Sequence, residues 1–285
     1  MAQRWNKTTM IDRAHRLFNT IHQKKRLANP NHEIHGLARK LNNWMPEAID
    51  SLITGTYFPR CLKRLYFEDE VVDTLYLPDR IMQNLILHEL KPTFSAVMSK
   101  NCLHLNGPHG VKLAHNRICD VLEHEQPVYV IRADIKSYYA SIPHYRLVQD
   151  IKKLYDDTRV QGLLERIIRN PLETKCGYKN PDHGITLRGP LSQFFSGIYL
   201  KLLDDAFETM DVTYIRYQDD ILIFCKTKCQ LNRCRRRMME ILRERQLKLS
   251  RKKSRIGRVD EGFHFLGVNY PARQESARVW QSEIG

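Results

Sequence analysis

The stretch Tyr214-Ile-Arg-Tyr-Gln-Asp-Asp-Ile-Leu-Ile-Phe224 decides how this sequence is interpreted, because two adjacent carboxylates, Asp219 and Asp220, interrupt an apolar and aromatic run. The residues on either side are mostly β-branched or aromatic and favour extended structure. The pattern therefore predicts a β-hairpin with Gln218-Asp219 at its tip. Two like charges held side by side repel unless a cation neutralises them, and hard oxygen ligands select Mg²⁺ or Mn²⁺.

A third carboxylate ends a second predicted strand. The segment Pro127-Val-Tyr-Val-Ile-Arg-Ala-Asp134 has the pattern of a buried strand that finishes in an acid. An acid at that place and an acid pair on a neighbouring hairpin could share two metal ions. Such a pair of ions suits in-line attack of a hydroxyl on a phosphate, since it stabilises both the attacking and the leaving oxygen. Asp134, Asp219 and Asp220 are therefore the predicted catalytic carboxylates.

Four motifs follow one another in an order that resembles a bacterial reverse transcriptase of the group II intron lineage and its stand-alone relatives. They are Asp134-Ile-Lys-Ser-Tyr-Tyr139, Gly189-Pro-Leu-Ser-Gln193, Tyr217-Gln-Asp-Asp220 and Gly262-Phe-His-Phe-Leu-Gly267. The pair of aspartates alone recurs by chance, whereas four ordered motifs are a specific signal. The resemblance covers about residues 63 to 270.

The resemblance implies a role for individual residues. Tyr139 would block the 2′-hydroxyl of a ribonucleotide and so select deoxynucleotides; the alternative is that Tyr139 belongs to the core and Tyr138 faces the site. Gln193 and Arg80 would contact the nucleotide, with a helix-surface and a framework role as their respective alternatives. The implied metal-binding residues are Asp134, Ile135, Asp219 and Asp220, and the implied primer and template contacts are Tyr217, Gln218, Leu266 and Gly267.

Helical and strand patterns mix without βαβ regularity, so the predicted fold class is α+β. The resemblance implies a right-hand polymerase fold, with fingers over 1–126, a palm carrying the aspartates over 127–258, and a primer-grip hairpin with a short tail over 259–285. The thumb is expected to be minimal or missing. The apolar spacing further predicts one long helix from Pro190 to Phe207 and a short strand from Leu247 to Ser250.

The formal net charge of +14 indicates a polyanionic partner, and basic residues concentrate between Lys226 and Arg258. We expect these basic residues to contact phosphates, which makes binding dependent on salt. The expected partners are an RNA template, the DNA product and dNTPs. No apolar run is long enough to span a bilayer and the N-terminus lacks a signal-peptide core, so a cytoplasmic location without a membrane partner is expected.

Seven cysteines form no regular framework, which is typical of reduced thiols in a cytosol. Cys225, Cys229 and Cys234 are close in sequence and could be considered as zinc ligands. Their spacing contains no CxxC pair and no histidine is nearby, so we interpret them as buried small hydrophobes.

The predicted function is RNA-directed DNA synthesis by two-metal nucleotidyl transfer, from a dedicated structured noncoding RNA in a bacterial antiphage defence system. Without a thumb, a bound RNA, a protein partner or a homo-oligomer would have to hold the duplex. Three alternatives stay open. They are untemplated or protein-primed DNA synthesis, a diversity-generating retroelement enzyme, which Ser192-Gln193 resembles, and a non-catalytic RNA-binding scaffold. An aromatic Tyr139 disfavours an RNA-directed RNA polymerase.

Overall fold

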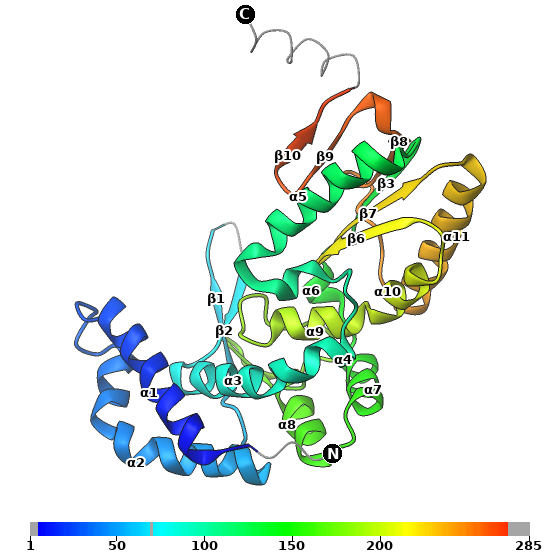
Figure 1. Cartoon of the computed structure of the whole chain (residues 1–285). Helices are drawn as coiled ribbons and strands as arrows, with labels where there is room; N and C mark the ends of the chain where they lie inside the picture. The colour runs from blue at the N-terminus through cyan, green and yellow to red at the C-terminus, as the bar shows by residue number, and fades with distance from the viewer. Residues whose placement is uncertain (1–4, 69–70, 273–285) are drawn as a thin grey trace, which may run out of the picture. The chain divides into compact units, whose positions relative to one another are not determined.

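The computed structural model describes residues 5–68 and 71–272 of the 285-residue chain (Figure 1). The chain divides into two compact units, each drawn from two separate segments. The first unit is drawn from Met1–Val97 and Ile142–Ile198, and the second from Met98–Ser141 and Tyr199–Gly285. None of the helices in the described ranges is both long and apolar enough to cross a bilayer.

Three packed helices, α1 (Lys7–Lys24), α2 (Glu33–Thr54) and α3 (Leu77–Leu90), form one layer of the first unit. Helix α2 continues through Pro46 and stops at Gly55, whose positive φ of 77° suits a residue without a side chain. The other helices of this unit are η1 (Lys91–Thr93), α4 (Phe94–Val97), α7 (His144–Leu154), α8 (Thr158–Ile168) and α9 (Ser192–Tyr199), the last of which reaches into the second unit by one residue.

The sheet of the first unit has the strand order β2-β1-β4-β5. Strand β1 pairs antiparallel with β2 and parallel with β4, so two distant parts of the sequence meet in it. Across β1 and β2, the Arg64 guanidinium binds both carboxylate oxygens of Asp73 at 2.7 and 2.8 Å. The strands are β1 (Leu62–Tyr66), β2 (Val71–Thr74), β4 (Leu172–Thr174) and β5 (Gly177–Lys179).

The second unit is organised around a four-stranded antiparallel sheet with the order β6-β7-β3-β8. Its two central strands are almost wholly buried, which agrees with their continuous apolar sequence. The strands are β3 (Tyr129–Asp134), β6 (Thr213–Tyr217), β7 (Asp220–Cys225) and β8 (Arg255–Arg258).

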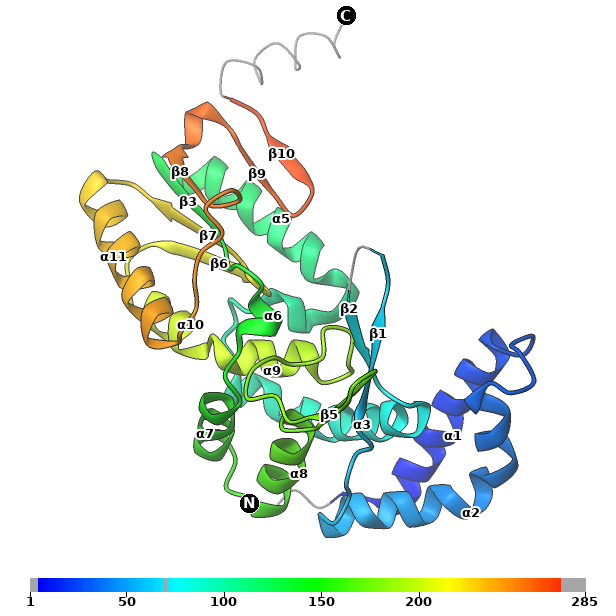
Figure 2. The same ribbon diagram turned by 180° about the vertical axis from the view of Figure 1, so that it is seen from behind.

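Helices cover both faces of this sheet (Figures 1 and 2). On one face, Val130, Leu222 and Phe224 pack against α5 (Gly110–Asp120) in a core that also takes in Phe265. On the other face lies α11 (Lys228–Glu244), which contacts β3 and β7. The remaining elements of this unit are η2 (Leu103–His109), the π-helical turn η3 (Val121–Glu125), α6 (Tyr138–Ser141), α10 (Lys201–Glu208), η4 (Val259–Glu261), β9 (Phe263–Phe265) and β10 (Val268–Tyr270).

Two local predictions are wrong. The predicted helix from Pro190 to Phe207 is two helices, because the backbone of Leu200 leaves the helical range with φ −97° and ψ 8°. The predicted strand from Leu247 to Ser250 contributes one bridge, between Leu249 and Ile135. The real edge strand is β8, whose mostly exposed residues lack the apolar alternation from which strands are recognised.

The mixture of helices and largely antiparallel strands confirms the α+β class. Both units combine early and late parts of the chain, whereas the predicted fingers, palm and primer-grip boundaries follow one another along it. Those boundaries stay a prediction.

Candidate active site

The acidic hairpin forms where the sequence predicts it. Strands β6 and β7 are joined by Gln218 and Asp219, and Tyr217 pairs with Asp220 across the turn. Gln218 adopts a positive φ of 57°, which a non-glycine residue takes only when its surroundings hold it. On the neighbouring strand, Asp134 lies directly opposite Asp220 in the β3–β7 register. The structure therefore brings the three predicted carboxylates to one end of the sheet.

The carboxylates of this end of the sheet repel one another. The pKa of Asp219 is raised to about 6, chiefly by burial and additionally by the charges of Asp220 and Asp134. Burial, followed by the charge of Asp134, also raises the pKa of Asp220. Like charges held together and partly withdrawn from water favour either protonation or a bound cation.

A lysine that the sequence offered only as one member of a basic cluster lies beside these acids. The Lys253 ammonium is 3.4 Å from Oδ2 of Asp134, and its charge lowers the pKa of both Asp219 and Asp220. The next residue, Ser254, accepts a hydrogen bond from the backbone N–H of Asp134 at 3.1 Å. The segment before β8 thus supplies both a cation and a positioning contact to the acidic end of β3.

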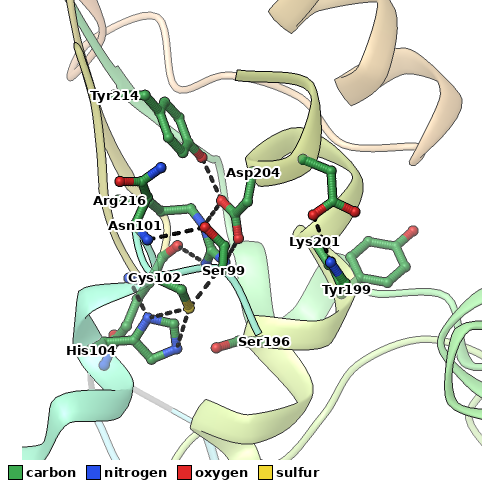
Figure 3. Close-up of polar contacts among 12 residues, drawn as sticks. Ser99, Asn101, Cys102, His104, Ser196, Tyr199, Lys201, Asp204, Tyr214 and Arg216 are labelled. Carbon is green, nitrogen blue, oxygen red and sulfur yellow. Dashed lines mark hydrogen bonds and ion pairs between the residues drawn. The ribbon is translucent and has the colours of Figure 1, made fainter. Parts of the chain in front are cut away.

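A buried ion pair between Arg216 and Asp204 is connected to the hairpin turn (Figure 3). The Arg216 guanidinium donates to both oxygens of Asp204, from Nε at 2.7 Å and from Nη2 at 2.5 Å, and both side chains are almost fully buried. Tyr214 donates its hydroxyl to the same carboxylate at 2.7 Å. The third guanidinium nitrogen, Nη1, donates to the backbone carbonyl of Gln218 at 3.0 Å. Asp204 on α10 is therefore linked through Arg216 to the residue that precedes Asp219.

His104 also binds this turn, through the backbone N–H of Gln218. Its Nδ1 accepts a hydrogen bond from the backbone N–H of Gln218 at 3.1 Å, and its ring lies edge-on to that of Tyr217. Since Nδ1 is the acceptor, a neutral His104 carries its proton on Nε2. Cys102 completes the cluster, because its sulfur accepts from Arg216 Nη2 at 3.1 Å (Figure 3). Burial raises the pKa of this thiol to about 11.

Sequence reasoning assigned no role to His104, Cys102 or Asp204. They lie far from the hairpin in sequence or have no recognisable motif around them. Their burial in the structure is what identifies them: His104 and Asp204 are each 1% exposed. Buried polar side chains are retained where they are bonded.

The two tyrosines after Asp134 differ in exposure. Tyr138 is buried, with a pKa raised well above its usual value by burial, while Tyr139 is partly exposed. Their rings meet edge-to-face with centroids 5.5 Å apart. Ile135 is buried, and because its side chain has no polar atom, only its backbone carbonyl could bind a metal ion.

The hairpin of β9 and β10 carries Leu266 and Gly267 at its turn. Both have positive φ, 47° and 84°, as a two-residue type I′ turn requires. Phe265 anchors the hairpin in the core of the second unit, and Tyr270 binds Nδ1 of His115 through its hydroxyl at 2.6 Å.

Gln193 and Arg80 belong to the first unit and both are exposed, Gln193 on α9 and Arg80 on α3. Within the segment around Arg80, the side chain that holds neighbouring segments together is that of Asp79. That carboxylate is 3% exposed and accepts hydrogen bonds from the Tyr57 hydroxyl and the Arg60 backbone N–H.

The donor set at Asp134, Asp219 and Asp220 fits a hard divalent cation, because it consists of carboxylate oxygens whose mutual repulsion a cation relieves. Over residues 5–68 and 71–272, no three His, Cys, Asp or Glu side chains are already gathered into a metal-binding cluster. An ion would therefore have to draw the carboxylates together. Cys225 and Cys234 are buried, as interpreted, whereas the interpretation of Cys229 as a buried residue is wrong, because it lies exposed in the first turn of α11.

A carboxylate at the end of one strand, facing an acid pair on an adjacent hairpin, is the arrangement by which enzymes transfer nucleotidyl groups with metal ions. Residues 73–270 match the reverse transcriptase (RNA-dependent DNA polymerase) family, and the chain belongs to this family. The match confirms the predicted RNA-directed DNA polymerase domain, and with it a site of the kind that uses divalent metal ions.

The chain is also similar to a curated protein and to solved structures. The chain is 23% identical over 266 residues to protein YkfC of Escherichia coli (strain K12), covering 76% of this chain and 68% of that protein. It shares its fold with apo telomerase from Candida tropicalis (TM-score 0.55, 13% identity, 75% of this chain) and with telomerase from Candida albicans in complex with a TWJ fragment of telomeric RNA (TM-score 0.56, 11% identity, 77% of this chain). It spans 47% and 46% of those two telomerase chains.

Proposed function

We propose that this protein is an RNA-directed DNA polymerase that joins deoxynucleotides by two-metal nucleotidyl transfer. The observation that carries the proposal is the register of β3 and β7, which sets Asp134 directly opposite Asp220 and next to the turn residue Asp219. Two Mg²⁺ ions, held by these carboxylates and the Ile135 carbonyl, would acidify the primer 3′-hydroxyl and offset charge on the triphosphate and the leaving pyrophosphate.

The chain's own residues position the reacting groups. Asp204, Arg216 and His104 fix both backbone groups of Gln218 and so hold Asp219 at the end of the hairpin. Lys253 offsets carboxylate charge beside Asp134. Tyr139, partly exposed beside buried Tyr138, selects deoxynucleotides by crowding the position of a 2′-hydroxyl.

The remaining proposed contacts come from the motifs. Gln193 and Arg80 bind the incoming nucleotide or the template. Tyr217 and Gln218 on the acidic hairpin, with Leu266 and Gly267 at the turn of the second hairpin, hold the primer and template. The exposure of Gln193, Arg80 and Gly267 supports contacts with a ligand.

We propose further that the template is a structured noncoding RNA, that the enzyme belongs to the group II intron-like lineage, and that it serves antiphage defence in the bacterial cytoplasm. The charge of +14 supports a polyanionic partner, and a telomerase of the same fold has been solved with a telomeric RNA fragment. A protein partner or a second copy of the chain would help to hold the duplex.

The test is incorporation of labelled dNTPs or NTPs by the protein purified together with its own RNA. The double substitution Asp219→Ala and Asp220→Ala is the control, and the products are sequenced with and without RNase pretreatment. DNA that requires the aspartates and copies the RNA supports the proposal and names the template. DNA that survives RNase and follows no RNA sequence points to untemplated synthesis. Tight RNA binding without any product points to a scaffold.

A further inference from the structure

A pocket lies on the face of the β6-β7-β3-β8 sheet that α11 covers. It has a volume of about 650 Å³ and opens between α11 and the strands β3 and β8, all within the second unit. Its volume falls within the range of about 300–1,000 Å³ that is usual for small-ligand sites. Ile131 and Ala133 line it, and these alternate along β3 with Asp134, so the pocket floor is the sheet face opposite to the Asp134 side chain.

The floor of the pocket is apolar and part of it is open to solvent. Met239 of α11 is 41% exposed and Ile256 of β8 is 44% exposed, although both are large hydrophobic residues. Exposing this apolar surface to water is unfavourable, and a flat apolar group that covered it would remove the surface from water.

The rest of the lining is strongly basic. Arg235, Arg236 and Arg243 come from α11, and no Asp or Glu is among the lining residues. Arg132 of β3 and Arg255 of β8 also border the pocket, but the two residues pair with each other in the register and alternate with Ile131 and Ile256, so their side chains lie on the Asp134 side of the sheet. The three arginines of α11 are exposed, and the described part of the chain provides no ion pair for them. Helix α11 presents these arginines because its capping box at Thr227 starts the helix in the phase that buries Leu231, Cys234 and Met238.

We propose that this pocket binds one unpaired nucleotide of RNA, with the base on the apolar floor and the adjoining phosphates on the arginines. Arginine pairs with phosphate through two parallel hydrogen bonds and also stacks on bases. An apolar floor needs a splayed-out base, which a continuous duplex does not offer. Because the pocket lies on the face opposite to Asp134, the bound segment is outside the path of the strand being copied. The pocket therefore anchors a non-copied part of the RNA, an inference that rests on the proposed RNA-directed polymerase function.

Binding is measured with the full-length protein and a fluorescent 12-nucleotide oligo(U) that carries one central 4-thiouridine. The variant Arg235→Gln/Arg236→Gln removes two arginines of the pocket. The matched control Arg233→Gln/Arg237→Gln removes two exposed arginines of the same helix that do not line the pocket. Thermal melting of each variant establishes that it is folded.

We expect Arg235→Gln/Arg236→Gln to weaken oligo(U) binding by about tenfold and to lower the slope of log K against log salt by about two. The control Arg233→Gln/Arg237→Gln should change the affinity by less than about twofold. The crosslink should map to α11 or β8. Ile256→Asn should weaken binding of oligo(U) by roughly fivefold while leaving binding of an RNA duplex unchanged, since only the unpaired base covers the apolar floor.

Equal losses for the two arginine pairs, or a crosslink elsewhere in the chain, would overturn the inference. So would an acidic peptide, poly-Glu, that binds through Arg235 and Arg236 while oligo(U) does not. Incorporation of dNTPs by the wild-type protein on a preannealed primer and template is measured in parallel. Failure of that reaction counts against the polymerase function, whereas success with a failed crosslink counts against the pocket alone.

Discussion

The guanidinium of Arg216 donates a hydrogen bond to the backbone carbonyl of Gln218, 3.0 Å away, while its other nitrogens are held by Asp204. The two residues flank Tyr217 at the end of β6, and Gln218 is the residue with positive φ directly before Asp219. A buried ion pair thus fixes the backbone at the point where the hairpin presents its acids. The predictions below test this arrangement and the charges around it.

The buried pair should be essential for stability. Asp204→Ala leaves the Arg216 guanidinium buried without its main partner, and we expect unfolding to become easier by about 3–5 kcal/mol. Asp205→Ala is the matched control, because Asp205 is the next residue and its ion pair with Lys201 is on the surface. That control should lose less than about 1 kcal/mol in urea unfolding. A loss of less than about 1 kcal/mol in Asp204→Ala as well would show that the buried pair is not important for stability.

His104 should act as a positioning residue for the turn. In His104→Ala the backbone N–H of Gln218 loses its acceptor, Asp219 is held less firmly, and kcat should fall by roughly tenfold or more with a small change in KM for dNTPs. His104→Asn can accept the same hydrogen bond and should recover part of the activity. Exposed His109 in the same 3-10 segment serves as the control. Equal kcat values for the alanine and asparagine variants would argue against positioning.

The pKa of Asp219, raised from its usual 3.8 to about 6, makes the metal-free protein less stable as pH rises. The folded chain holds this proton more tightly than the unfolded chain, so the contribution to stability is complete below about pH 4 and is lost between about pH 4 and 6. Asp219→Asn should therefore raise the stability of the metal-free protein at pH 8 by about 1 kcal/mol, or Tm by about 2–4 °C. Mg²⁺ should raise Tm in the wild type and much less in the variant. A variant that melts below the metal-free wild type at pH 8 would contradict this.

Lys253 should compete with a divalent ion for the carboxylates. Its ammonium lies 3.4 Å from Asp134 and is largely exposed, so its influence is modest. At pH 8, Lys253→Met should lower the Kd for Mg²⁺ by about three- to fivefold in a calorimetric titration. Lys252→Met, one residue earlier and also exposed, should leave that Kd unchanged. Weaker Mg²⁺ binding in Lys253→Met would instead indicate that the lysine supports the ion.

Tyr139 should decide which sugar is accepted. Tyr139→Val removes the ring that is proposed to crowd the 2′-hydroxyl, and incorporation of NTPs relative to dNTPs should rise by about tenfold or more. The ratio of kcat/KM for the two substrates measures this. Tyr178→Val, at an exposed tyrosine of β5, is the control. An unchanged ratio would show that Tyr139 does not select the sugar.

Much of the candidate site could be predicted from local sequence. The β-branched and aromatic residues on either side of Gln218-Asp219 define the hairpin, and a buried-strand pattern ends at Asp134. The helix break at Leu200 and the edge strand β8 could not be predicted in this way, because tertiary contacts override weak local preferences there. The roles of Gln193, Arg80, Leu266 and Gly267 stay predictions.

The sequence by itself determined the family, the α+β class and the two segments that carry the three acids, because strand periodicity and short motifs are properties of neighbouring residues. Only the tertiary structure decided which distant residues support them. Asp204 pairs with Arg216, His104 meets Gln218, and Lys253 reaches Asp134 across 119 positions of sequence. These contacts depend on how the sheet, α10 and the segment before β8 pack in space. Burial strengthens the Asp204–Arg216 and His104–Gln218 contacts, whereas the Lys253 ammonium is largely exposed.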